Sequence, residues 1–88
     1  MQVKNMTSNK GNKIANQFVI KTDDATYFQS YNSVIAKITN DHFIYLDETY
    51  WNWSRTTSKY RSIFLGESTE ETKRKIASGH YMLTKLNK

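Results

Sequence analysis

The sequence predicts a small α+β domain, in which an antiparallel sheet of about four strands carries two short helices on one face. Two observations predict this class. Apolar residues alternate with period two through the first half of the chain, from about residue 14 to residue 47. Residues 54–79 instead carry apolar residues at helical spacing, with capping residues beside them. The expected order of elements is therefore ββββαα, with one further strand possible at the C-terminus.

Each predicted strand is bounded by turn residues. The first carries Ile14, Phe18 and Ile20 on one face, and the acidic pair Asp23-Asp24 that follows it favours a turn. The third predicted strand, residues 34–39, could instead be a helix, but its β-branched residues favour a strand. We expect an antiparallel meander of strands over residues 14–22, 26–30, 34–39 and 43–47.

The two helices are predicted from their caps. Gly66 stands where a C-terminal cap glycine belongs, which places the first helix over residues 55–65, with Ser54 or one of the threonines after Arg55 capping its start. Ser68 and Glu71 form a capping box for the second helix, which should end at residue 77 or 78 before a glycine.

The two ends of the chain receive different predictions. Residues 1–12 are polar and aperiodic, so we expect a flexible N-terminal arm followed by a single α+β domain over residues 13–88. Residues 81–86 are expected to form a last strand or an extended segment docked on the core.

Size and composition narrow the possible functions. Eighty-eight residues make one small domain, with no room for a deep cofactor cleft between two domains. The absence of cysteine excludes disulfides, thiolate zinc sites and cysteine nucleophiles, and it favours a reducing, cytoplasmic setting. No stretch approaches the apolar length of a membrane span, so we expect no membrane partner.

The residues needed for catalysis do not form a recognisable set. His42 and His80 are the only histidines, and neither has the spacing of a metal-binding pair. Three glycines supply no phosphate-binding loop, and no serine lies in a nucleophile elbow. We therefore expect a non-enzymatic protein with no catalytic residues, metal or cofactor.

The strongest functional feature is an acid-free cluster of aromatic and basic residues between Tyr50 and Arg61. Aromatic rings stack on nucleic-acid bases and cations contact phosphates. On a regular helix the aromatic residues would pack inward and the cations would be exposed. Either tryptophan could instead cover the open end of the sheet. The candidate partner-binding or nucleic-acid-binding residues are Trp51, Trp53, Arg55, Lys59, Arg61 and Lys73.

The run Lys73-Arg74-Lys75 contributes little to that surface. Consecutive residues on a helix fan out by about 100° each, so the three cannot form one patch. Glu70 and Glu71 stand four residues before Arg74 and Lys75, the favourable order for helix-stabilising ion pairs. Lys73 is the cation expected to stay unpaired.

Several short motifs are spread along nearly the whole chain, from about Lys10 to Asn87. They are Asn16-Gln17-Phe18-Val19-Ile20, Thr26-Tyr27-Phe28-Gln29-Ser30-Tyr31, Ile35-Ala36, Tyr50-Trp51-Asn52-Trp53-Ser54, Thr56-Thr57, Lys59-Tyr60-Arg61, Phe64-Leu65-Gly66, Lys75-Ile76 and Ser78-Gly79-His80-Tyr81. With these motifs the chain resembles a family of small proteins of unknown function carried by bacteriophages and plasmids of bacteria. The resemblance implies a mobile-element setting in a bacterial cell, but no activity or catalytic residue.

Three hypotheses of function follow. The leading one is an accessory protein that binds nucleic acid, or a nucleoprotein, through the aromatic–basic cluster. The second is a protein–protein inhibitor of a bacterial defence nuclease, similar to an anti-CRISPR protein, because Trp, Tyr and Arg also dominate interface hot spots. The third is a self-associating structural protein, a homodimer that pairs through exposed sheet edges.

Overall fold

A six-stranded mixed sheet, with its strands in chain order, forms one layer of the computed structural model, which describes residues 1–87. Neighbouring strands are antiparallel except β5 and β6, which are parallel. The strands are β1 (Gln2–Thr7), β2 (Lys13–Lys21), β3 (Ala25–Ser30), β4 (Ser33–Thr39), β5 (Ile44–Asp47) and β6 (Tyr81–Thr84), and the helices are α1 (Arg55–Leu65) and α2 (Thr69–Ala77).

The α+β class and the two helices are confirmed, and the four predicted strands correspond to β2–β5. The expectation of an antiparallel sheet of about four strands is met only in part, because the sheet has six strands. The further C-terminal strand that the sequence allowed for is present as β6, but it is parallel to β5. β1 lies inside the segment expected to be a flexible arm, where Gln2 pairs with Lys21 and Val3 with Ile20. β6 follows a crossover through both helices, and such a connection brings the chain back parallel to the strand that it left.

Both helices begin and end as their caps predict. The Ser54 side chain accepts a hydrogen bond from the Thr57 N–H, and Gly66 ends α1 in the left-handed conformation, with φ 71°. The capping box between Ser68 and Glu71 is present at the start of α2. These local signals fix the helix boundaries independently of the tertiary fold.

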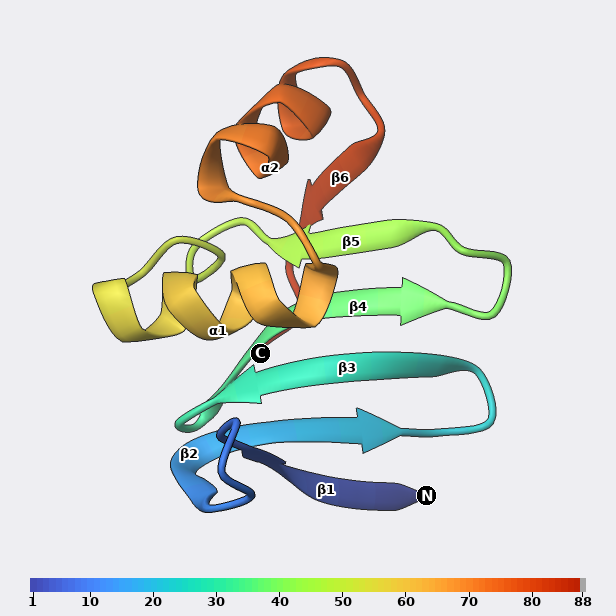
Figure 1. Cartoon of the computed structure of the whole chain (residues 1–88). Helices are drawn as coiled ribbons and strands as arrows, with labels where there is room; N and C mark the ends of the chain where they lie inside the picture. Colours follow the sequence, from blue (N-terminus) through green and yellow to red (C-terminus); the bar gives the residue numbers. More distant parts are fainter. Residues whose placement is uncertain (88) are drawn as a thin grey trace.

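The core lies between the sheet and the helices, which cover the same face (Figure 1). Its buried apolar residues come mainly from the middle strands, and the Phe64 ring of α1 stacks on Phe28 with ring centroids 5.6 Å apart. The cluster consists of Phe28, Ile35, Ala36, Leu46 and Tyr81. The other face of the sheet carries no helix (Figure 1).

The segment after β6 closes one corner of the sheet. The Leu86 N–H donates to Asp47, and the Asn87 side chain both donates to and accepts from the backbone of Val34. β5 pairs with β4 only from Ala36 onward, so the Asn87 side chain supplies hydrogen-bond partners for the backbone of Val34, near the start of β4. No helix within residues 1–87 is long and apolar enough to cross a membrane.

Candidate binding site at the start of α1

The aromatic segment before α1 is folded into turns rather than extended. The Asp47 carboxylate accepts the N–H groups of Thr49 and Tyr50, at 3.1 and 2.8 Å. The Trp51 N–H donates to the Asp47 carbonyl, and the Trp53 N–H donates to the Tyr50 carbonyl. Burial acts to raise the pKa of Asp47. Hydrogen bonds to its carboxylate from Leu86, Tyr50, Asn87 and Thr49 nevertheless hold this pKa below its ordinary value. Asp47 therefore organises the segment as a carboxylate.

Because the segment turns, its two tryptophans have different environments. Trp51 is half-buried and packs against the core cluster. Trp53 is 65% exposed, and its ring meets Tyr50 edge-on at 4.9 Å. The two tryptophans therefore differ in role: Trp51 covers the core, whereas Trp53 faces solvent.

Arg61 is fully buried, which corrects the expectation that α1 exposes all its cations. Its Nη1 donates to the Trp51 carbonyl at 2.8 Å and to Asn52 Oδ1 at 3.0 Å, and Nη2 donates to Thr69 Oγ1 at 2.7 Å. The guanidinium also lies 5.2 Å from the Trp51 ring centroid. Arg61 therefore ties α1 to the preceding turn and to the start of α2, and it is not available to a ligand.

The environment of Arg61 carries an electrostatic cost. Burial lowers the pKa of its guanidinium, while the nearby Glu67 acts in the opposite direction. The sequence held a signal for this burial, because Arg61 stands four residues after Thr57 and three before Phe64. Residues at these spacings share one helix face, and that face packs on the sheet.

A cavity of about 410 Å³ opens beside Trp53, between the start of α1 and the β3–β4 turn. Its walls combine aromatic rings with hydroxyl groups. Thr57 Oγ1 lies within hydrogen-bonding distance of Ser30 Oγ at 3.1 Å and of Ser54 Oγ at 3.2 Å, so part of the hydroxyl wall is cross-linked. The lining residues are Ser30, Tyr31, Ser33, Ile35, Tyr50, Trp53, Ser54, Thr56 and Thr57.

Tyr31 forms part of this wall from the two-residue turn between β3 and β4. Its backbone is in the left-handed region, with φ 56°, which a bulky residue adopts rarely. The Tyr31 N–H donates to the Asn16 carbonyl at 2.7 Å, which holds the turn against β2. Tyr31 is 51% exposed as a residue, so the cavity is bordered by two exposed aromatic residues, Tyr31 and Trp53.

The exposed cations of α1 lie along the outward side of the helix. Arg55 and Lys59 are one helical turn apart, and both are exposed. Lys59 also borders a second cavity, of about 280 Å³, together with the β1–β2 loop residues Ser8 and Asn9. We define the Trp53 site as the cavity beside Trp53 together with Arg55 and Lys59.

Lys73 lies outside this site. It belongs to α2, which packs on β6, whereas α1 packs on β3 and β4 (Figure 1). Its Nζ is 3.8 Å from a Glu70 oxygen, so the expectation that Lys73 stays unpaired is wrong. The predicted pair between Glu71 and Lys75 is also absent, because Lys75 Nζ instead contacts a Glu67 carboxylate oxygen at 2.8 Å.

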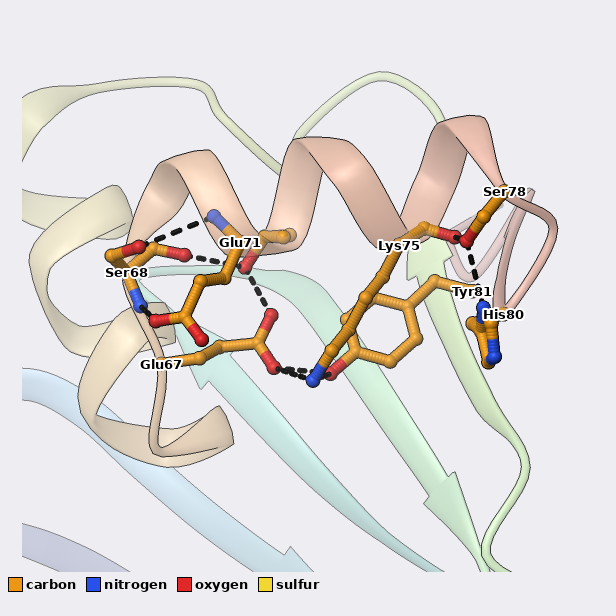
Figure 2. A network of polar contacts seen from close by, with 8 residues as sticks. Glu67, Ser68, Glu71, Lys75, Ser78, His80 and Tyr81 are labelled. Carbon is orange, nitrogen blue, oxygen red and sulfur yellow. Dashed lines mark hydrogen bonds and ion pairs between the residues drawn. The ribbon is translucent and has the colours of Figure 1, made fainter.

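Figure 2 shows the network that holds α2 against β6. The Glu67 carboxylate accepts hydrogen bonds from the Tyr81 hydroxyl at 2.5 Å, from Lys75 Nζ at 2.8 Å and from the Thr72 hydroxyl at 2.6 Å. Burial acts to raise the pKa of Glu67, but these three donors lower it overall. Burial and Glu67 raise the pKa of Tyr81. Through these contacts Glu67 joins the start of β6 to α2.

The histidines form no larger ligand set. His42 and His80 border the same cavity, of about 540 Å³, beside the exposed Phe43. Their neighbours there are apolar or aromatic apart from the backbone. Within residues 1–87 no group of three or more His, Asp or Glu side chains is placed to hold a metal ion.

The comparisons with known proteins identify a family without a known activity. The chain matches a family of unknown function (DUF8033) over residues 1–79. This match covers most of the 88 residues, and the chain therefore belongs to that family. Searches of curated proteins and of solved structures gave no match.

Proposed function

We propose that this chain is a non-enzymatic protein that binds single-stranded nucleic acid at the Trp53 site. The observation that carries the proposal is the exposed Trp53 ring at the mouth of a cavity, beside the exposed Arg55 and Lys59. An unpaired base stacks on an accessible aromatic ring, and flanking phosphates are attracted by the cations. Bases inside a duplex have no free face to offer, so single strands should bind more tightly.

The charge distribution supports a polyanionic ligand at this end of the molecule. Residues 1–22 and 49–66 contain no Asp or Glu. The β1–β2 loop lies at the same end of the sheet as the start of α1 (Figure 1), and this end adds Lys10 of the loop and Lys13, the first residue of β2. The acidic turns containing Asp23, Asp24 and Asp41 lie at the opposite end of the strands. At the Trp53 end, the Asp47 carboxylate is buried against backbone N–H groups, and Glu48 is exposed. A nucleic acid would therefore approach the Trp53 end.

The cavity chemistry favours a base over a bare phosphate. Its aromatic rings supply apolar surface, and the accessible hydroxyls of Ser33, Ser54 and Thr56 can donate and accept hydrogen bonds at a base edge. Some of the cavity's hydroxyls already bond to one another, so the site accepts different bases rather than reading one. We infer limited sequence preference, with affinity from stacking and charge.

The biological setting is also part of this proposal. The resemblance to proteins of bacteriophages and plasmids suggests an accessory factor that acts in the cytoplasm of a bacterial host. A host defence protein is the alternative partner for the same residues, because exposed Trp and Arg are common in interface hot spots.

The test is fluorescence anisotropy with labelled single-stranded and double-stranded DNA and RNA over a salt series. Contacts from Lys10, Lys13, Arg55 and Lys59 predict a slope of log affinity against log salt of about −3 for a single strand. Trp53→Ala should weaken binding by about tenfold or more. Negligible binding at low salt would refute the proposal and direct attention to a protein partner.

Two matched controls make the test specific. Phe43→Ala removes an aromatic ring of nearly the same exposure, 63% against 65%, from the acidic end of the sheet, and it should leave binding unchanged. Lys73→Ala removes a cation from α2 and should have far less effect than Arg55→Ala or Lys59→Ala. Equal losses from site and control variants would mean that binding is non-specific attraction to a basic protein.

A further inference from the structure

A continuous row of side chains crosses the helix-free face of the sheet. Tyr27 directly precedes Phe28, whose ring packs under α1, and adjacent residues on a strand point to opposite faces. The strand register places one residue of each strand directly beside the next, from edge to edge. We call this set the open-face row: Val3, Ile20, Tyr27, Lys37, Tyr45 and Met82.

The open-face row is apolar apart from one residue. Val3 is 59% exposed and Met82 is 55% exposed, at the two edges. Lys37 is the exception, and its Nζ lies 5.7 Å from the Tyr27 ring centroid and 5.9 Å from that of Tyr45. A sheet face that stays in water normally carries polar residues at these positions. A row with five apolar members therefore indicates a surface that another protein covers.

The chain exposes 6092 Å², more than the roughly 5,400 Å² expected for a compact monomer of 10.4 kDa. Few apolar residues are fully buried within residues 1–87, so the folded chain has a small core to which an interface would add.

We propose that the open-face row is a homodimer interface, in which two sheets pack face to face about a twofold axis between β3 and β4. The axis lies along the strands and exchanges β3 with β4, β2 with β5, and β1 with β6. Tyr27 then faces Lys37 of the second copy, Ile20 faces its Tyr45, and Val3 faces its Met82. Each contact occurs twice, as a twofold interface requires.

The position of this axis determines what the Lys37 ammonium group, the one charge in the open-face row, contacts in the dimer. An axis along β4 would bring two Lys37 ammonium groups together, which is unfavourable in a buried contact. An axis between β3 and β4 places each ammonium against a tyrosine ring of the other copy. The lysine stem also contributes apolar surface to the contact. The row is therefore complementary to itself in this arrangement.

The dimer is independent of nucleic-acid binding. α1 covers the opposite face of the sheet, so the Trp53 site stays exposed in both copies (Figure 1). Two sites on one particle would engage a long strand together, which raises apparent affinity without any new contact. The dimer stands whether or not the Trp53 site binds nucleic acid.

Sedimentation velocity over a concentration series tests the proposal on the whole chain. We expect dimers that dissociate on dilution, and a wild-type chain that stays monomeric at about 100 μM would overturn the interface. Val3→Lys should weaken the dimer by roughly tenfold. Ile63→Lys, at 57% exposure on α1, is the matched control and should leave it unchanged. Equal effects of the two substitutions would also overturn the proposal.

A charge-pair rescue tests the position of the axis. Met82→Glu alone should weaken the dimer as Val3→Lys does. The double variant Val3→Lys with Met82→Glu should restore it, because each lysine then faces a glutamate of the second copy. Within one chain these residues lie on opposite edge strands, so rescue can arise only between copies. A dimer that the double variant fails to restore would refute this geometry, and circular dichroism confirms that each variant is folded.

Discussion

The two helices have similar lengths but treat their charges in opposite ways. α2 begins with acids, ends with bases, and anchors Lys75 on the buried Glu67 together with Tyr81. α1 carries no acid, buries Arg61, and leaves Arg55 and Lys59 exposed. In α2, Lys73 contacts Glu70 and Lys75 contacts Glu67, while Arg74 is exposed without an ion pair among the described residues. In α1, Arg55 and Lys59 are both exposed and neither has an ion pair among the described residues. The difference indicates that a cation's neighbours, rather than its presence in a basic run, decide whether it can bind.

The largest expected effect comes from breaking the buried contacts of α1. Arg61→Ala leaves the Trp51 carbonyl, Asn52 and Thr69 without their donor, and it opens a cavity beside the Trp51 ring. We expect a loss of about 3 kcal/mol in the free energy of unfolding, measured by urea denaturation. Arg55→Ala, an exposed arginine on the same helix, is the control and should cost under about 0.5 kcal/mol. Equal losses would show that Arg61 does not brace α1.

The corresponding change next to α2 is Glu67→Gln, just before the helix begins, which removes the charge that its three hydrogen-bond donors share. We expect a loss of about 2 kcal/mol at neutral pH. The folded-state pKa values of Glu67 and Asp47 lie below their ordinary values, so each carboxylate contributes stability above its unfolded pKa. That contribution disappears as pH falls through the folded pKa.

The acid side of the thermal stability profile checks this sign. Between about pH 5 and about pH 2 the wild-type melting temperature should fall more steeply than that of Glu67→Gln. Tyr81→Phe keeps the carboxylate and removes one donor, so its acid limb should lie between the two. If Glu67→Gln left the fall of the melting temperature at acid pH unchanged, the proposed contribution of the Glu67 carboxylate to stability would be wrong.

The smallest predicted difference separates the two tryptophans. Trp51→Ala should destabilise the fold by about 2 kcal/mol, because its ring packs on the core and on Arg61. Trp53→Ala should cost less than about 1 kcal/mol, because its ring is mostly in water. Denaturant midpoints measured side by side test the order, and a reversed order would contradict the assignment of Trp53 to the binding surface.

The sequence could predict those elements whose signals are local. The Ser54 cap, Gly66 and the Ser68–Glu71 box fix both helices because each acts within a few residues of the chain. β1 could not be predicted in this way. Its side chains are largely exposed, so its pairing with β2 leaves no alternation of apolar and polar residues in the sequence. The parallel direction of β6 likewise depends on the crossover through both helices.

The candidate site was predicted in part, for similar reasons. The acid-free composition around Trp53, Arg55 and Lys59 is visible in the sequence. The burial of Arg61 depends on Trp51 and Thr69, which lie ten and eight residues away from it. The contributions of Tyr31 and the β1–β2 loop depend on the sheet register, which brings distant segments to one end of the molecule. Contacts of this kind have no pattern within a short window of sequence.

The central claim is that an accessible Trp53 binds unpaired bases. It is tested most directly by tryptophan fluorescence in Trp51→Phe, which retains Trp53, and in Trp53→Phe, which retains Trp51. Titration with a single-stranded oligonucleotide at low salt should quench the emission of Trp51→Phe strongly and leave that of Trp53→Phe nearly unchanged. Equal responses from the two variants, or no response from Trp51→Phe, would contradict the claim.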